Sequence, residues 1–514
     1  MVMGELSTST EVLIIGAGPG GYVAALRAAQ LGKQVTLVDK GEVGGICLNI
    51  GCIPSKALIH AADLAGKIRA AGALGIHSGK VRIDIKQLRS WKEQVVKTLT
   101  GGVRGLLAQR GVTVMQGEAR FEGSNKVRVS TSSGNQLISF THAIIATGSI
   151  PIEIPGFAFD GKTVWSSEEA LTLPSIPKQL CIIGGGYIGL ELGGVYQKLG
   201  SKVTIVQRGD TLLPFVPSEA VRILQRSMEE MGVSFLLDAS ATGLRKGKDL
   251  TISLEQGGKK TSLICDAVLV AVGRRPNTRG LSLENTSVKV DERGFVVVDT
   301  QMRSTDPSIF AIGDLAGEPM LAHKASRQGH VAAEVIAGQS SAFDNQCVPA
   351  VIFTDPEVAL VGMMPEEAEK AGHDVKTGTF PFSASGRAVT THSTKGFVKL
   401  VTDAKNGLVL GGLIVGAHAS DIISEVALAI EMGATAEDLL LTIHPHPTFG
   451  EAIMEAAADA MGQAIHVSRG KVSAPQDDST ITSASTSIRS RSKRHSGPST
   501  KKRSPMPRFR KPKR

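Results

Sequence analysis

Two cysteines, Cys47 and Cys52, lie close together in the stretch GGICLNIGCIPSKALI, just before Pro54. Proline at a first helical position, followed by SKALIHAADLAGKI, predicts that a helix begins here and that both sulfurs lie at its N-terminus. The unpaired N–H groups and the positive dipole end of a helix favour a thiolate, so a cysteine there exchanges disulfides readily. The spacing therefore predicts a redox-active pair.

A structural disulfide or a metal pair is the alternative interpretation of these cysteines. The loop between them is too short to constrain the unfolded chain much, and five cysteines in 514 residues are too few for a secreted disulfide framework. Zinc would need a second pair, whereas Cys181, Cys265 and Cys347 each stand alone beside an apolar run. We expect these three to be buried small hydrophobes and expect no metal site.

Two histidines, His444 and His446, alternate with prolines in the run IHPHPTFGE, and Glu451 follows His446. Proline fixes φ and holds each imidazole in a set direction, and Glu451 could orient the ring of His446. A histidine in a proline turn is by itself more often structural. The cysteine pair favours a chemical role, because thiol chemistry needs a base that titrates near neutral pH.

The elements that must position these residues begin with a glycine fingerprint. The apolar strand EVLIIG runs into GAGPGGYVAALRAAQLG, in which Gly16, Gly18 and Gly21 have the G-x-G-x-x-G spacing. These glycines permit a tight turn, close approach of the backbone to a pyrophosphate and close packing of helix on strand. The next strand, QVTLVDK, carries Asp39 where a carboxylate can hold a ribose hydroxyl. Together they predict a dinucleotide site.

A second fingerprint opens in QLCIIGGGYIGLELGGVYQKLG, where Gly184, Gly186 and Gly189 repeat the spacing after another apolar strand. The strand SKVTIVQRGD follows, so this unit also has the strand–turn–helix–strand order of a dinucleotide site. Because the cysteines come just after the first unit, the sequence predicts two dinucleotides that face each other.

The remaining segments set the domain order. Residues 60–110 are predicted to be helical, with short strands near 112–115 and 126–129. From Val348 the strands appear antiparallel, followed by the helices DIISEVALAIEMG and FGEAIMEAAADAMG. We expect a first dinucleotide-binding domain at 1–150, a second at 151–278, a return segment of the first or central domain at 279–347, a C-terminal domain at 348–467 and a disordered basic tail at 468–514.

The formal net charge of +9 hides a division of the chain at about residue 467. From Ser468 onward there are 14 Lys and Arg against two Asp, a balance of +12, which leaves −3 for the rest. No apolar run reaches the ~18 residues of a membrane span. The N-terminus, MVMGELSTST, has neither a signal core nor an Arg-rich transit face, so we expect a cytoplasmic protein without membrane contact.

The cysteine motif, both fingerprints and the runs AIIATGS, VAVGRRPN, FAIGD and HPHPTFGE resemble those of the pyridine nucleotide–disulfide oxidoreductases, in the same order. The resemblance covers about residues 10–467 and points to the lipoamide branch of that family. It implies an α/β flavoenzyme with FAD on the first fingerprint, NAD on the second and a homodimer formed through an α+β C-terminal domain. It also implies oxidation of dihydrolipoamide, with a lipoyl-bearing acyltransferase of a 2-oxo-acid dehydrogenase complex as partner.

The resemblance also implies catalytic roles by position. Cys47 matches the sulfur that exchanges with substrate, and Cys52 matches the sulfur that lies against the flavin. His446 matches the base, which in this family reaches the cysteines from the other subunit, with Glu451 as its partner.

Cofactor contacts are implied in the same way. Lys56 and Glu191 match an ion pair near the flavin, while Asp39 and Asp314 match groups on ribose and ribityl hydroxyls. Asp314 could instead be a plain helix N-cap. The cofactor-binding residues expected in all are Gly16, Gly18, Gly21, Asp39, Lys56, Thr147, Gly148, Asp314, Gly184, Gly186, Gly189, Glu191, Gln207, Arg208 and Gly273.

One position departs from the family pattern. Members that use NAD carry a Glu at the end of the second unit's second strand, whereas here Gln207 precedes Arg208. Loss of the carboxylate removes repulsion against a 2′-phosphate, and Arg208 could pair with one. Against NADP stands Gly189, where phosphate-binding relatives tend to have Ala, so we expect NAD.

Two other interpretations differ in class. The first is an NADPH-dependent disulfide reductase of the same family, like glutathione or mercuric reductases. Mercuric reductases lack the His base and carry a C-terminal cysteine pair, which this chain does not have, and the HPHPT form favours the lipoamide branch over the glutathione branch. The second is a scaffold or nucleic-acid-binding protein with an inactive flavin fold, against which the intact Cys47, Cys52 and His446 argue.

The basic tail generates a first prediction. Because it carries +12 and little apolar surface, it should bind polyanions through counterion release, unless it is a solvated extension with no partner. Truncation after Val467 should leave lipoamide turnover and dimerisation unchanged and abolish retention on a heparin column at low salt. Loss of the dimer or of activity on truncation would place the tail within the fold.

Overall fold

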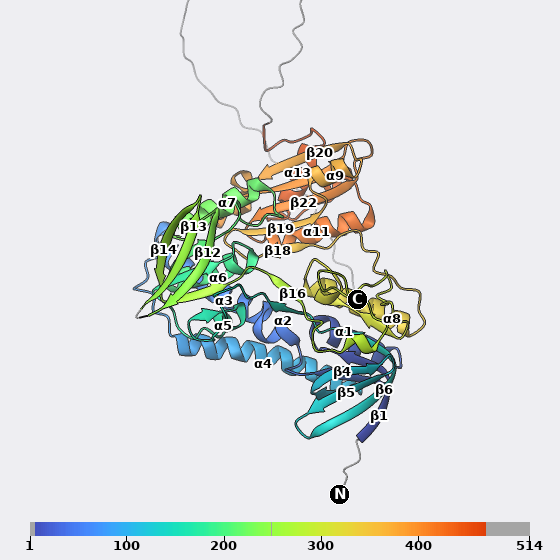
Figure 1. Cartoon of the computed structure of the whole chain (residues 1–514). Coiled ribbons are helices and arrows are strands. Elements are labelled where there is room, and N and C mark those ends of the chain that lie inside the picture. The colour runs from blue at the N-terminus through green and yellow to red at the C-terminus, as the bar shows by residue number, and fades with distance from the viewer. Residues whose placement is uncertain (1–5, 248, 469–514) are drawn as a thin grey trace, which may run out of the picture. The chain divides into compact units, whose positions relative to one another are not determined.

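We describe residues 6–247 and 249–468 of a computed structural model of the 514-residue chain (Figure 1). The predicted tail lies outside the described residues except for Ser468. In the described part, most of the helices accompany three larger sheets, of which two are mainly parallel and one is antiparallel.

The first sheet has seven strands, and a segment far along the chain completes it. The strands are β1 (Leu6–Ile15), β2 (Val35–Asp39), β3 (Thr113–Gln116), β4 (Glu118–Gly123), β5 (Lys126–Thr131), β6 (Gly134–Ile145) and β17 (Ile309–Ala311). They lie in the order β3-β2-β1-β6-β5-β4, with β17 parallel to β6. Strand β1 pairs in parallel with β2 and β6, which aligns Ile15 with Val38 and with Ile145 at the carboxyl edge.

Helices α1 (Pro19–Gln30) and α8 (Ala322–Ile336) share one hydrophobic core with this sheet. They pack closely, because a Cβ at Gly329 would lie 2.6 Å from the carbonyl oxygen of Gly20. An ion pair of 2.7 Å between Arg27 and Glu334 also joins them. The return segment is therefore part of the first fingerprint's framework.

The second parallel sheet has the order β11-β10-β9-β15-β8 and holds the second fingerprint. Its strands are β8 (Val164–Trp165), β9 (Gln179–Ile183), β10 (Lys202–Val206), β11 (Ser234–Leu236) and β15 (Ala267–Val270), with helices α5 (Ser167–Thr172), α6 (Tyr187–Leu199) and α7 (Ser218–Glu230). Strands β12 (Ala239–Lys246), β13 (Leu250–Gln256) and β14 (Lys259–Cys265) form a separate antiparallel sheet, and β7 (Ser149–Pro151) pairs with β16 (Arg274–Pro276).

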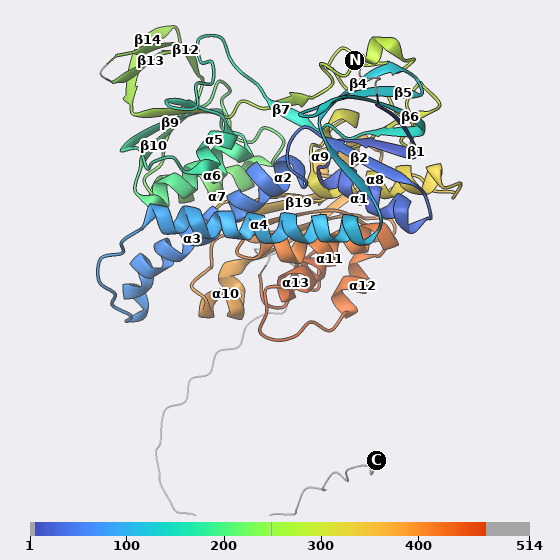
Figure 2. The ribbon, with the colours of Figure 1, turned by 90° about the horizontal axis from the view of Figure 1, so that it is seen from below.

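The helical region after the cysteines differs from the expectation in two ways. Helix α3 (Cys52–Ala70) begins at Cys52, so Pro54 is its third residue, and Cys47 lies in a separate short helix, α2 (Gly45–Ile50). Residues 75–84 are not helical, and the long helix α4 (Ile85–Gln109) begins anew because the Asp84 side chain accepts a hydrogen bond from the Gln87 N–H. Figure 2 shows α3 and α4 side by side.

The third sheet is antiparallel, as expected, with the order β18-β19-β22-β21-β20. Its elements are β18 (Ala350–Ile352), β19 (Glu357–Gly362), β20 (Val375–Pro381), β21 (Phe397–Asp403) and β22 (Val409–Gly416), with α9 (Pro365–Lys370), α10 (Gly386–Thr390), α11 (Ala419–Met432), α12 (Ala436–Leu441) and α13 (Glu451–Ala460). Strand β20 and helix α12 were not expected. Helix α13 lies close on β20, because a Cβ at Gly378 would be 2.0 Å from the carbonyl oxygen of Ala456.

One described stretch, Gly45–Leu74, is long and apolar enough on average to cross a membrane by length and composition alone, although charged residues such as Lys56 and Asp63 interrupt it. Its helix α3 buries Leu58 and Ala62 in the core of the second sheet. It also carries Lys56 and Asp63, both of which form ion pairs with α6. These contacts are typical of a core helix, and the cytoplasmic location stays a prediction.

Candidate active site

The first fingerprint forms a tight loop that only glycine allows. Gly16 has φ +108°, and a Cβ there would lie 2.2 Å from the carbonyl oxygen of Ala146. A Cβ at Gly21 would lie 1.8 Å from the carbonyl oxygen of Gly16, so α1 packs directly on the turn. At Gly18, a Cβ would meet no atom within 4 Å, and this residue faces a cavity. The N-terminus of α1 is thus open to an anion.

The second fingerprint repeats this backbone arrangement. Gly184 has φ +115°, and a Cβ there would lie 2.4 Å from the carbonyl oxygen of Ala271. A Cβ at Gly189 would lie 2.2 Å from the carbonyl oxygen of Gly184. Gly186 again has open space beside it. An alanine at position 189 would push α6 away from the turn, which is a physical reason for glycine here.

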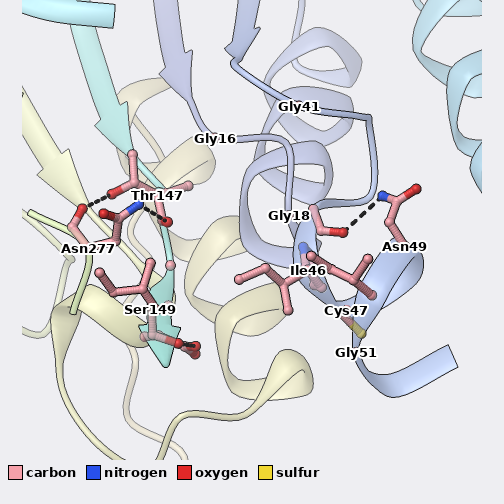
Figure 3. A pocket seen from close by; sticks show the side chains of 18 of the residues that line it. Gly16, Gly18, Gly41, Ile46, Cys47, Asn49, Gly51, Thr147, Ser149 and Asn277 are labelled. Atoms are coloured by element: carbon pink, nitrogen blue, oxygen red, sulfur yellow. Dashed lines mark hydrogen bonds between the residues drawn. The ribbon is translucent and has the colours of Figure 1, made fainter. Parts of the chain in front are cut away.

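A cavity of about 660 Å³ lies beside the first fingerprint and reaches both cysteines. Figure 3 shows Gly18, Cys47 and Asn49 on one side of it, with Thr147 and Asn277 on the other. Its volume is in the range of cofactor pockets. Its lining residues relevant to the chemistry are Gly16, Gly18, Asp39, Cys47, Cys52, Lys56, Thr147, Gly148, Tyr187, Glu191, Arg274 and Asp314.

The cysteines are free thiols with opposite tendencies to ionise. The hydrogen bond from the thiol of Cys47 and, to a lesser extent, the charge of Lys56 lower the pKa of Cys52 to about 7, against the effect of burial. The same hydrogen bond, together with burial, raises the pKa of Cys47 far above its usual range. Cys52 is therefore the thiolate, and Cys47 keeps the proton.

Lys56 and Glu191 form an ion pair of 2.9 Å between α3 and α6. The side chain of Glu191 is only 6% exposed, and its other oxygen accepts the N–H of Phe353 at 3.0 Å. The ammonium of Lys56 lies 4.3 Å from the ring centroid of Phe353. A fixed positive charge therefore stands at the end of the cavity beside Cys52.

Asp39 and Asp314 both reach the cavity. Asp39 accepts hydrogen bonds from the N–H groups of Ala17 at 2.5 Å and Gly41 at 2.7 Å. These bonds tie the first fingerprint loop to the end of β2. Asp314 lies at the start of the short 3₁₀ helix Gly313–Ala316 and accepts a hydrogen bond from the Ser149 hydroxyl at 2.6 Å. No side-chain cap is formed there, which is against the plain N-cap interpretation of Asp314.

The opposite wall contains Thr147, which we expected, together with Ser149, Arg274 and Asn277, which our sequence analysis missed. Arg274 donates from Nε to the Ser149 hydroxyl at 2.8 Å and from Nη2 to the Ser149 carbonyl at 2.7 Å. Thr147 donates its hydroxyl to the carbonyl of Asn277 at 2.8 Å. In the sequence, these residues lie in AIIATGS and VAVGRRPN, and their position next to Gly148 and Gly273 is the signal that points to them.

Tyr187, also missed, follows directly after Gly186 and lines the cavity near Cys52. Burial raises the pKa of its phenol to about 12, so the ring stays neutral. Of the remaining cysteines, Cys181 and Cys265 are buried as expected, whereas Cys347 is only half-buried because it lies at the edge of α11 near Ala427 and Glu431.

Gln207 does not project freely at the end of β10. Its Oε1 accepts the N–H of Gly185 at 2.9 Å, and its Nε2 donates to the carbonyl of Thr211 at 3.1 Å. Arg208 beside it is exposed. The neutral amide thus serves the second fingerprint loop, and the exposed Arg208 offers a positive charge just after β10.

His446 and Glu451 form a pair, with Nδ1 of the imidazole 2.7 Å from Oε1 of the carboxylate. The His446 side chain is 77% exposed and does not line the cavity of the cysteines in the same chain. His444 differs, because it is 6% exposed and both its nitrogens have partners, Thr442 carbonyl and Glu425, each at 2.8 Å. Of these two histidines, His446 is the one with an exposed imidazole.

Comparisons with known proteins agree with this geometry. The family model described as pyridine nucleotide-disulphide oxidoreductase matches residues 10–329, and the model of its dimerisation domain matches residues 348–457. Dihydrolipoyl dehydrogenases from Haloferax volcanii and Geobacillus stearothermophilus are 50% and 48% identical to this chain, each over 91% of it and 99% of the relative.

Solved structures extend the likeness to the fold. The structure of LpdA from Mycobacterium tuberculosis has a TM-score of 0.82 at 28% identity and is matched over 87% of this chain and 99% of its own. The HOCl-induced flavoprotein disulfide reductase RclA from Escherichia coli has a TM-score of 0.78 at 28% identity, with the same coverage. The chain therefore belongs to the pyridine nucleotide-disulphide oxidoreductases, enzymes that use FAD and a nicotinamide nucleotide.

Proposed function

We propose that the chain is a dihydrolipoyl dehydrogenase, which oxidises dihydrolipoamide to lipoamide and reduces NAD to NADH. The observation that carries the proposal is the Cys47–Cys52 pair at the end of a dinucleotide-sized cavity, with Cys52 as thiolate beside Lys56. Relatives 46% to 50% identical over most of the chain have that name, which favours it over an NADPH-dependent disulfide reductase such as RclA at 28%.

The described residues fit FAD at the first fingerprint. The open side of Gly18 at the N-terminus of α1 would hold the pyrophosphate, Asp39 a ribose, and Asp314 the ribityl chain. Gly184, Gly186 and Gly189 would hold NAD in the same way. When bound, these cofactors supply the route by which two electrons leave the cysteine pair as a hydride.

This assignment gives each part of the chain a role. Residues 1–150 and 279–347 would form the FAD-binding part, 151–278 the NAD-binding part and 348–467 the interface. The pairing of β17 with β6 supports the joining of the first two segments.

The thiol steps follow from the charges at the pair. His446 accepts a proton from one thiol of the substrate, and the resulting thiolate attacks Sγ of Cys47 in the oxidised Cys47–Cys52 disulfide. A mixed disulfide forms as Cys52 leaves as a thiolate, which Lys56 stabilises. The second substrate thiol attacks the substrate sulfur, closes the lipoamide ring and releases Cys47, which takes up a proton.

In this proposal the base comes from a second copy of the chain, because His446 does not line the cavity of its own chain. Its exposed imidazole, oriented by Glu451, is suited to reach a partner's cysteines across a homodimer built on the dimerisation domain. We propose that the physiological substrate is the lipoyl group of an acyltransferase in a 2-oxo-acid dehydrogenase complex, as the names of the relatives suggest.

We predict that the purified protein is yellow and that reduction by two electrons produces long-wavelength absorbance from the Cys52 thiolate against the flavin. Because the pKa of Cys52 is lowered to about 7, the thiolate is present above that pH and lost as the pH falls through it. A pH titration of the absorbance measures this. Cys52→Ser should abolish the band, and an unchanged band would contradict the assignment of the two cysteines.

His446→Gln should lower the turnover of dihydrolipoamide with NAD by roughly 10²–10⁴-fold, the range for a positioned base, without loss of FAD. His444→Gln is the matched control and should lower it much less, because His444 is buried with both nitrogens bonded. Steady-state assays measure both. Equal losses would show that the base is misassigned.

Gln207→Glu should increase the preference for NAD over NADP, because a carboxylate bonds ribose hydroxyls and repels a 2′-phosphate. Arg208→Ala should change kinetics only if NADP is used. The measurement is kcat/KM for each nucleotide. A wild-type enzyme several-fold better with NADP would overturn the choice of NAD and make Arg208 the reason.

A further inference from the structure

The segment after β18, Phe353–Asp355, contacts the two helices that carry the ion pair beside Cys52. The N–H of Phe353 donates to Glu191 Oε1 at 3.0 Å, and its ring lies under the Lys56 ammonium at 4.3 Å. Lys56 in turn donates to the other oxygen of Glu191 at 2.9 Å. One residue of the dimerisation segment therefore contacts both members of the pair.

A second ion pair anchors the same segment farther along the helices. Lys198 on α6 lies 2.6 Å from Asp63 on α3 and 2.7 Å from Asp355, with its own side chain 11% exposed. Burial opposes the charge of Lys198, but Asp355 and Asp63 outweigh burial and raise its pKa. The two carboxylates therefore keep Lys198 charged.

The two ion pairs lie on matching helix faces. Lys56 and Asp63 are seven residues apart on α3, and Glu191 and Lys198 are seven apart on α6. Seven residues are close to two helical turns, so each helix presents both of its charged groups on one side. Phe353 contacts the first pair and Asp355 contacts the second. These two contacts fix the position of the Phe353 ring along the axes of both helices.

We propose that Phe353 is a positioning residue that holds the Lys56 ammonium beside Cys52 and thereby sets how readily the thiolate forms. The inference rests on the proposed function, since it concerns the same cysteine pair. Lys56 has a third of its side chain exposed, so its flexible stem needs a second contact besides Glu191 to keep the charge in place. The aromatic face supplies that contact.

Other groups also act on Cys52 and must be kept constant in a test. They are the thiol of Cys47, which donates to it, the carboxylate of Glu191, which opposes its charge, and the phenol of Tyr187, which stays neutral. A change of the Phe353 ring leaves in place the backbone N–H that bonds Glu191. The effect of Phe353 should therefore be visible as a shift of the Cys52 titration alone.

The test is Phe353→Leu in the holoenzyme, reduced anaerobically with one equivalent of dihydrolipoamide. Leucine keeps the backbone N–H that bonds Glu191 and keeps an apolar side chain, but it removes the aromatic face. The pH at which the long-wavelength absorbance is half-lost should rise, by up to about 0.5–1 unit, because the energy of the whole cation–π contact sets the upper limit of the shift. Phe353→Tyr retains the face and should titrate like the wild type.

An unmoved midpoint in Phe353→Leu would overturn the inference, as would equal shifts in the Leu and Tyr variants. A lower Tm with an unchanged midpoint would show a purely structural role and also overturn it. If Phe353→Leu does not fold, Phe353→Met gives the same comparison. Absence of the band in the wild type would instead overturn the proposed function, so the two failures can be distinguished.

Discussion

The crossing of α3 and α6 brings a lysine and a glutamate together at the end of the cavity, and the chemistry of the cysteine pair depends on that contact. A carboxylate as buried as Glu191 is tolerated because Lys56 and the Phe353 N–H satisfy both of its oxygens. The pair in turn holds a positive charge beside Cys52 without a mobile counter-ion. The hydrogen bond between the two thiols, together with this charge, separates the sulfurs, which have the same chemistry in isolation, into a thiolate and a protonated thiol.

The two fingerprints show how one backbone design accepts different side chains. In both loops the N–H after the first glycine needs an acceptor, and the residue at the end of the next strand supplies it: Asp39 to Ala17 in the first, Gln207 to Gly185 in the second. The geometry is shared, whereas the charge is not. In the sequence, Gln207 in place of the family's Glu suggests that a ribose contact is lost. In the structure, Gln207 keeps the hydrogen bond to the Gly185 N–H, so the replacement changes only the electrostatics around Arg208.

A single chain holds both halves of the proposed thiol chemistry but does not bring them together. The cysteines line the cavity, while His446 is exposed within the segment that the dimerisation-domain model matches, residues 348–457. Leu441 and Ile443, just before it, are 71% and 94% exposed, which is unusual for large apolar side chains. Burial of these side chains against a second copy would provide a physical reason for the homodimer.

The sequence by itself determined the family, the two dinucleotide units, the cysteine pair and the His446–Glu451 pair, because these depend on short spacings that fix local backbone geometry. It misplaced the start of α3, joined α3 to α4 and missed β20, because helix caps such as Asp84 and edge strands leave weak local patterns. Only the tertiary structure decided which cysteine ionises, how Gln207 is used and that Phe353 contacts the Lys56–Glu191 pair. Those outcomes depend on contacts between residues more than a hundred positions apart, or on side-chain orientation, and neither is encoded in spacing along the chain.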